Sequence, residues 1–211
     1  MTIDDSRGDL QGPTGNTYEK YSTANPVSRF LVDRFLAALD EMVGSGMPGS
    51  VLDVGCGEGI VTERLARRLG AGVPVEGLDV DDPVLHEEWA SRGGGNLTFT
   101  TGSAYRHPHA TDSVDMVVAV EVFEHLQEPG RALREAARVA RDALVVTAPR
   151  EPLWRLGNML SGRYWRRLGN TPGHINHWSR SGLAEFTGRV GTVVELRSPV
   201  PWTLVRLDLR G

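Results

Sequence analysis

The sequence is poor in cysteine and has no long apolar run. A single cysteine, Cys56, in 211 residues excludes an internal disulfide framework and a cysteine-based structural zinc site. No stretch of about 18 apolar residues occurs, and residues 1–17 are polar, without the apolar core of a signal peptide. We therefore expect a cytoplasmic protein.

The chain also has only a small excess of one charge over the other. The formal net charge is -4, from 27 acidic and 23 basic residues, which argues against a general electrostatic affinity for nucleic acid or anionic membranes. We expect no DNA partner. The 40% of apolar residues suffices for one globular core, so we predict a single domain over 18–211. Residues 1–17 contain too few apolar groups to offset the entropy of ordering, which predicts a flexible N-terminal arm.

Short apolar stretches alternate with amphipathic ones along most of the chain. Because these apolar stretches lack a polar alternation, they predict parallel strands that helices cover on both faces. The predicted strands are 51–54, 74–80, 97–101, 114–120, 143–148, 193–197 and 202–208. The predicted helices are 26–43, 59–69, 83–90, 129–140 and 179–189.

The last two predicted strands are joined only by the short Ser198-Pro199 connection. This connection is too short for a crossover helix, so the two strands must pair antiparallel. We therefore predict an α/β fold with a doubly wound, seven-stranded sheet in the order 3-2-1-4-5-7-6. One strand is antiparallel, and helices lie on both faces.

A glycine-rich loop, D-V-G-C-G-E-G at 53–59, follows the first predicted strand and precedes a helix. In a doubly wound sheet, ligands lie beyond the carboxyl ends of the strands, where the winding reverses. Gly55 and Gly57 can adopt backbone angles closed to other residues, and Gly59 opens the helix. Ile60 stands where a dinucleotide fingerprint has its third glycine. The D-x-G-x-G-x-G pattern instead resembles motif I of class I S-adenosylmethionine (SAM)-dependent methyltransferases.

Further segments extend this resemblance to roughly residues 48–150. Asp79 ends the second predicted strand about 20 residues past the glycine loop, where a carboxylate can accept both ribose hydroxyls. Residues 112–126 are similar to the strand-four region of small-molecule methyltransferases grouped with the ubiquinone and menaquinone enzymes, the methyltransferase type 11 group. The resemblance implies a Rossmann-like fold, SAM as cofactor and methyl transfer to a small-molecule acceptor, for example a sugar, a lipid or another secondary metabolite.

The resemblance also implies a set of cofactor-binding residues. Where the family often has Gly-Asp-Ala, with the aspartate on the adenine amino group, this chain has Gly-Ser-Ala at 102–104. Serine thus replaces the aspartate, and its hydroxyl can still accept a hydrogen bond. The expected cofactor-binding residues are Asp53, Gly55, Cys56, Gly57, Gly59, Asp79, Val80, Ser103, Ala104 and Glu121.

Three residues are candidates for catalysis. Because the methyl group is already activated by the sulfonium, the protein mainly aligns the acceptor, although a hydroxyl acceptor must also lose its proton. Glu124 and His125 follow the fourth predicted strand, and either can serve as the general base. Alternatively, both cap the next turn and line the cofactor site. We expect His174 to face the acceptor or to bond the backbone.

An insertion over 150–178 is the predicted acceptor-covering segment. It combines an apolar and aromatic stripe with arginines: Leu153, Trp154, Leu156, Met159, Leu160, Tyr164, Trp165, Arg150, Arg155, Arg163, Arg166 and Arg167. Such a surface favours an amphiphilic or anionic acceptor, such as a phosphorylated sugar or lipid, or a peripheral membrane contact. The alternative is a helical cover with core aromatics and solvated arginines.

Two other functions remain open. Glu121, Glu124, His125 and His174 are similar to the metal ligands of small-RNA 3'-end 2'-O-methyltransferases, which would make the protein a metal-dependent RNA enzyme. The acidic composition and the lack of a separate RNA-binding motif argue against RNA, and we expect no metal. The second alternative is a SAM-binding module that no longer catalyses.

Overall fold

The computed structural model describes residues 25–160, 168, 170–171 and 173–211, so the predicted arm at 1–17 lies outside the described residues. The first half of the chain alternates helices and strands. Its elements are α1 (Pro26–Ser45), β1 (Val51–Val54), α2 (Ile60–Leu69), β2 (Val75–Asp79), α3 (Pro83–Arg92) and β3 (Leu97–Thr101). The second half contains β4 (Val114–Val120), the 3-10 helix η1 (Phe123–His125), α4 (Pro129–Val139), β5 (Ala140–Pro149), α5 (Leu153–Leu160), α6 (Arg180–Thr187), β6 (Thr192–Arg197) and β7 (Trp202–Asp208).

The seven strands form one sheet in the order β3-β2-β1-β4-β5-β7-β6. Strands β1 to β5 pair in parallel, while β7 pairs antiparallel with both β5 and β6. The predicted fold class and strand order are therefore confirmed, including the single antiparallel strand. The winding reverses between β1 and β4, which places a ligand-binding crevice at the carboxyl ends of these two strands.

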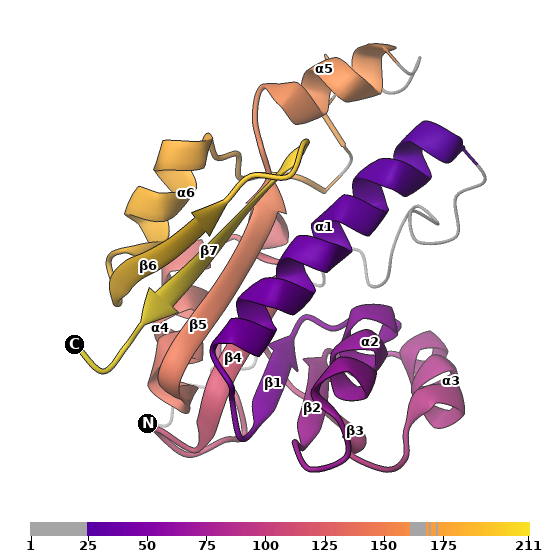
Figure 1. Cartoon of the computed structure of the whole chain (residues 1–211), viewed down its shortest axis with the longest axis vertical. Coiled ribbons are helices and arrows are strands. Elements are labelled where there is room, and N and C mark those ends of the chain that lie inside the picture. The colour runs from indigo at the N-terminus through magenta and orange to yellow at the C-terminus, as the bar shows by residue number, and fades with distance from the viewer. Residues whose placement is uncertain (1–24, 161–167, 169, 172) are drawn as a thin grey trace, which may run out of the picture.

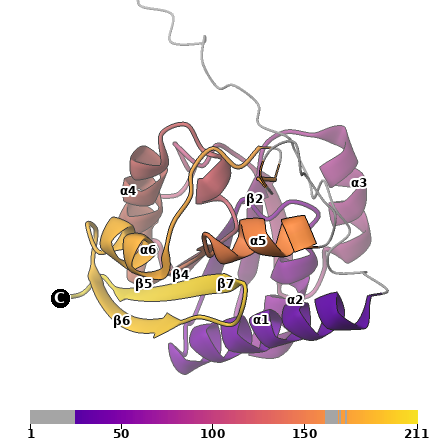
Figure 2. The same cartoon turned by 90° about the horizontal axis from the view of Figure 1, so that it is seen from above.

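Helices cover both faces of the sheet, as Figure 2 shows from above. Apolar side chains of α1 and α2 pack on one face, and those of α4 and α6 pack on the other. Neighbouring strand residues divide between the two cores: Val51 belongs to the first and Leu52 to the second, and both are buried. This two-sided burial explains why the strands lack a polar alternation.

Local signals set most element ends. The Asn25 side chain caps α1 by accepting hydrogen bonds from the backbone N–H groups of Val27 and Ser28, at 2.9 and 3.2 Å. The start of β5 differs from the prediction, because the chain passes from α4 directly into the strand and Ala140 already pairs with Val114. Among the described residues, no helix has both the length and the apolar character needed to cross a membrane.

Candidate active site

The glycine loop lies at the predicted place, after β1 and before α2. Gly55, Gly57 and Gly59 have φ angles of 72°, 54° and 80°, in the left-handed region that favours glycine. A Cβ added at Gly55 would lie 2.5 Å from Val122 Cγ2, whereas one at Gly57 would meet no atom within 4 Å. The loop is thus packed at one glycine and open at the next, which leaves room for a ligand to approach its backbone.

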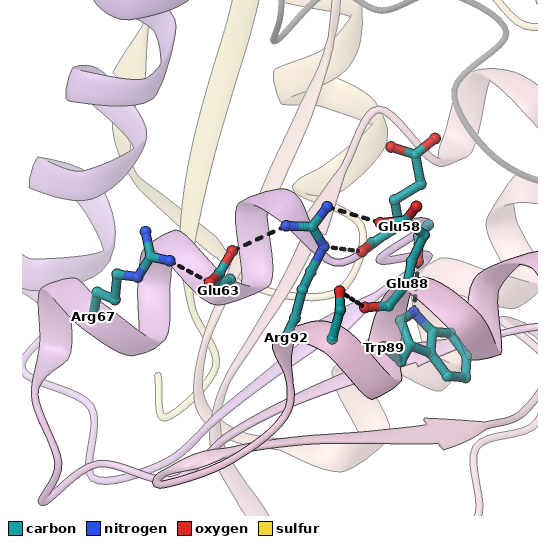
Figure 3. A network of polar contacts seen from close by, with 8 residues as sticks. Glu58, Glu63, Arg67, Glu88, Trp89 and Arg92 are labelled. Carbon is teal, nitrogen blue, oxygen red and sulfur yellow. Dashed lines mark hydrogen bonds and ion pairs between the residues drawn. The ribbon is translucent and has the colours of Figure 1, made fainter.

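Helix α3 braces this loop from below (Figure 3). Trp89 Nε1 donates to the Gly57 carbonyl at 2.8 Å, and Arg92 Nε donates to the Glu58 carbonyl at 2.9 Å. The Arg92 guanidinium also contacts the carboxylates of Glu63 and Glu88, at 3.1 and 2.9 Å. Arg92 therefore connects α2, α3 and the loop. Sequence analysis did not identify Trp89 or Arg92, because both read as ordinary residues of an amphipathic helix.

Asp79, at the end of β2, faces the same loop. Its Oδ2 accepts a hydrogen bond from the Gly57 N–H and its Oδ1 one from the Val80 N–H, each at 2.7 Å. Burial raises the pKa of Asp79, and the two backbone hydrogen bonds oppose that rise. A carboxylate oxygen has two acceptor sites, so each oxygen keeps capacity for one ligand hydroxyl.

Asp53 lies deeper, at the end of β1, with 1% of its surface exposed. Its Oδ2 accepts a hydrogen bond from Thr62 Oγ1 at 2.8 Å, while Oδ1 has no hydrogen-bond partner among the described residues. Burial raises the pKa of Asp53 to about 7, and the Thr62 hydrogen bond opposes the rise. Burial also raises the pKa of the neighbouring Cys56 thiol, which therefore stays protonated.

Ser103 and Ala104 follow β3, whose last residue pairs with Asp79. Ser103 Oγ accepts a hydrogen bond from the Tyr105 N–H at 3.2 Å, so the hydroxyl stabilises a turn. Ala104 packs against the core on the side of α4. Val80 is half-buried beside the Asp79 carboxylate. The structure thus places these residues at the carboxyl edge of the sheet, and an adenine contact by Ser103 stays a prediction.

Glu121 follows β4 in an unusual conformation. Its φ of 56° lies in the left-handed region, which costs energy for a residue with a side chain. Its Oε1 accepts a hydrogen bond from the Trp202 indole Nε1 at 2.7 Å, and its N–H is held by Thr147 of β5. Trp202, which sequence analysis did not identify, therefore directs the Glu121 side chain from the antiparallel strand β7.

Glu124, His125 and His174 come together, although 49 positions separate the two histidines in the sequence. Among the described residues, one ligand atom of each lies within 4.8 Å of the others. The two imidazole rings meet edge to face, with centroids 4.9 Å apart. His125 Nδ1 lies 3.1 Å from the Gly173 carbonyl oxygen. Glu121 is not part of this group, so the structure assembles three of the four residues that the RNA-enzyme resemblance implies.

Comparison with known proteins agrees with this arrangement. Residues 52–143 match the family described as "Methyltransferase domain". The chain is 32% identical over 127 residues to the ubiquinone biosynthesis O-methyltransferase of Aeromonas salmonicida, covering 56% of this chain and 51% of that protein. A demethylmenaquinone methyltransferase of Roseiflexus castenholzii is 28% identical over 154 residues, covering 70% and 63%. Residues 52–143 of this chain are therefore similar to methyltransferase domains.

The matched region spans about half to two thirds of the length of these two relatives. The solved magnesium protoporphyrin IX methyltransferase of Synechocystis PCC 6803, with bound SAH, superposes on this chain with a TM-score of 0.65. That match covers 88% of each chain at 18% identity, which establishes a shared fold and no more.

Helix α5 lies beyond the carboxyl ends of the parallel strands (Figure 1). Trp154 anchors it: the indole Nε1 donates to Thr171 Oγ1 at 2.9 Å, and the ring contacts those of His174 and Trp202. Leu156 on the same helix is 51% exposed. Part of the predicted acceptor-covering insertion, including Arg163, Tyr164, Trp165, Arg166 and Arg167, lies outside the described residues.

Proposed function

We propose that this protein transfers a methyl group from SAM to a small-molecule acceptor at the carboxyl edge of β1 and β4. The observation that carries the proposal is the pairing of a left-handed glycine loop with Asp79. The loop is open at Gly57, and both Asp79 oxygens keep acceptor capacity beside it. This arrangement suits a ligand with two neighbouring hydroxyls next to a segment that lies against the backbone.

In this proposal, different residues at the carboxyl edge of the sheet bind different parts of the cofactor. Asp79 accepts the ribose hydroxyls, Gly55 to Gly59 contact the chain of the ligand, and Val80, Ser103 and Ala104 border the adenine. The unpaired Oδ1 of Asp53 and the Glu121 carboxylate supply negative charge for the cationic end. When bound, SAM supplies a methyl group on a positively charged sulfur, so the chain needs only to align an acceptor and handle its proton.

Glu124, His125 and His174 form the acceptor side. Glu124 and His125 follow β4 directly, and Val122 next to them packs against Gly55 of the glycine loop. If His125 Nδ1 carries its proton toward the Gly173 carbonyl, Nε2 presents a lone pair to the site. The group thereby has the chemistry to take a proton from an acceptor, which suits an acceptor hydroxyl.

The surroundings of α5 support an amphiphilic acceptor. Trp154 and Met159 are half-buried and Leu156 is exposed, which gives an apolar surface near the acceptor side. The Nε atoms of Arg150 and Arg155 are buried without a hydrogen-bond partner among the described residues. Such donors suit an anionic group, for example a phosphate or carboxylate, on the acceptor. The relatives named for ubiquinone and menaquinone biosynthesis add support for a small-molecule acceptor.

The test incubates the full chain with methyl-labelled SAM and separate panels of phenolic or quinol compounds, phosphorylated sugars, lipids and short RNAs. We expect label in a small molecule and none in RNA. The matched control is Asp79→Ala, which should abolish labelling at low SAM concentration. Label in RNA alone would refute the small-molecule proposal, and calorimetric SAM binding with no labelled acceptor in any panel would favour the non-catalytic module.

A further inference from the structure

We propose that Trp202 is a positioning residue for the cofactor. Its indole N–H holds the Glu121 carboxylate at the carboxyl edge of β4 and β5, and through Glu121 it sets the affinity for the cationic end of SAM. The inference rests on the proposed function, which gives Glu121 the role of supplying negative charge to that end. It deepens the proposal by adding a residue of the antiparallel strand β7 that acts without touching the cofactor.

The backbone of Glu121 is strained, and the strain points to a function. The described residues include four non-glycine residues with a positive φ: Met47, Asp112, Glu121 and Leu168. The other three are exposed and lie between helices and strands, whereas Glu121 is half-buried directly after the core strand β4. A side chain at positive φ costs energy and persists where the surrounding structure holds it, commonly at functional sites.

Two strands hold Glu121, one through its backbone and the other through its side chain. The Glu121 N–H donates to the carbonyl oxygen and to the Oγ1 of Thr147 on β5, each at 3.2 Å. The Glu121 Oε1 accepts the hydrogen bond from Trp202 Nε1 at 2.7 Å. A hydrogen bond to an ionised carboxylate is shorter and stronger than one between neutral groups. Trp202 therefore limits where the carboxylate can turn once Thr147 has fixed the backbone.

Trp202 can act as a support because it is itself fixed. Its side chain is buried, and its backbone, the first residue of β7, pairs with Pro149 at the end of β5. Its ring lies 4.8 Å from that of Phe35 and 5.7 Å from that of Trp154, measured between centroids. Because β7 runs antiparallel to β5, its first residue lies at the carboxyl edge of the sheet. Unlike the glycine loop, Glu121 thus depends on a distant segment, 81 positions away.

The location of Glu121 connects this contact to SAM affinity. The next residue, Val122, packs against Gly55, so Glu121 adjoins the glycine loop. A fixed carboxylate attracts the positively charged end of SAM and loses little side-chain freedom when the ligand binds. Without the Trp202 N–H, Glu121 would have to be ordered by the ligand itself. The loss should therefore weaken SAM binding and leave the chemical step of the saturated enzyme nearly unchanged.

The experiment is a double-mutant cycle on SAM affinity, measured by calorimetry with the full chain. Trp202→Phe keeps an aromatic ring and removes the donor, so SAM affinity should fall about three- to tenfold. In a Glu121→Ala background the same change should matter by less than about twofold, because no carboxylate remains to be positioned. Equal losses in the two backgrounds would show that Trp202 acts through packing alone and would overturn the inference.

Steady-state kinetics add a readout that a packing role would not give. In Trp202→Phe the KM for SAM should rise by the factor lost in affinity, while kcat stays within about twofold of wild type. The matched control is Phe35→Leu, which removes a ring contact to Trp202 and leaves the hydrogen bond in place. It should lower the urea midpoint but keep SAM affinity within about twofold of wild type. A loss of SAM affinity in Phe35→Leu equal to that in Trp202→Phe would overturn the inference.

Two further outcomes are informative. If Trp202→Phe does not fold, Glu121→Gln decides, because its amide oxygen still accepts from Trp202 while the charge is gone. SAM affinity should then fall as much as in Glu121→Ala, and wild-type affinity in Glu121→Gln would overturn the inference. A folded wild-type chain that binds no SAM would refute the proposed function together with this inference. SAM binding with equal losses in both backgrounds of the cycle would overturn this inference alone.

Discussion

The glycine loop and the Glu124–His125–His174 group lie at the same edge of the sheet, but different kinds of contact hold them. The loop is braced by Asp79, Trp89 and Arg92, which lie within 34 residues of their partners in the sequence. The group is closed by contacts that span 48 residues or more. The proposed cofactor side is therefore built from neighbouring βα units, and the proposed acceptor side is built from segments that meet only in the finished fold.

This difference suggests that the acceptor-side segments can change in sequence while the glycine loop keeps its shape. A loop braced by its own βα units keeps its shape when distant segments change. Residues 173–178 contact η1 through a few hydrogen bonds, and Trp154 joins α5 to Thr171 and His174, so this region can change with the acceptor. We therefore expect substitutions on the acceptor side to leave SAM affinity nearly unchanged, and substitutions on the cofactor side to act through SAM affinity. Four predictions test this separation.

The largest effect is expected from Asp79→Ala on the cofactor side. The change removes the proposed acceptor of two ribose hydroxyls and the partner of the Gly57 N–H. SAM affinity should fall by about 2 to 4 kcal/mol, or roughly 30- to 700-fold. Calorimetry measures it, with the exposed neighbour Asp81→Ala as the control. Wild-type affinity in Asp79→Ala would refute the assignment.

Asp53→Asn should separate stability from binding. Because burial raises the pKa of Asp53 from 3.8 to about 7, the folded state holds its proton more firmly than the unfolded state. Stability from this group is therefore present below about pH 4 and is lost as the pH rises through about 7. The amide stays neutral and can still accept the Thr62 hydrogen bond. The variant's stability relative to wild type should thus rise between pH 4 and 8, by up to about 4 kcal/mol.

The same substitution should weaken SAM binding, since it removes a negative charge from the cationic end of the proposed site. Wild-type SAM affinity should rise from pH 6 to 8 as Asp53 ionises, and the Asn variant should lack this rise. Urea unfolding and calorimetry at several pH values measure both properties. An unchanged pH dependence of SAM binding in Asp53→Asn would place Asp53 outside the cofactor site.

Trp154→Ala tests the acceptor side. The indole contacts His174 and Trp202 and donates to Thr171, so its loss should loosen the segment that carries His174. We expect methyl transfer to fall about tenfold, equivalent to about 1.4 kcal/mol of the barrier, with SAM affinity within about twofold of wild type. Leu156→Ala, on the same helix but half-exposed, is the control. Equal loss of SAM binding in Trp154→Ala would make α5 a structural cover.

The smallest effect is expected from Trp89→Phe. Phenylalanine keeps most of the stacking on Phe99, where the rings lie 5.3 Å apart, but loses the hydrogen bond to the Gly57 carbonyl. SAM affinity should fall by about 0.5 to 1.5 kcal/mol, or roughly 2- to 13-fold. Isothermal titration with SAM measures the change. A larger loss of acceptor turnover than of SAM affinity would contradict the separation of the two sides.

The sequence by itself determined the strand order, the glycine loop and the place of Asp79. These features follow from local patterns: unbroken apolar stretches mark parallel strands, a four-residue connection forces β6 and β7 to pair antiparallel, and three glycines meet a turn that needs positive φ angles. The tertiary structure alone decided that Trp202 of β7 would hold Glu121, that Trp89 and Arg92 would brace the loop, and that His174 would join Glu124 and His125 in a group that excludes Glu121. Those contacts join side chains that lie far apart in the sequence and meet only in the completed fold. Local sequence patterns therefore do not predict them.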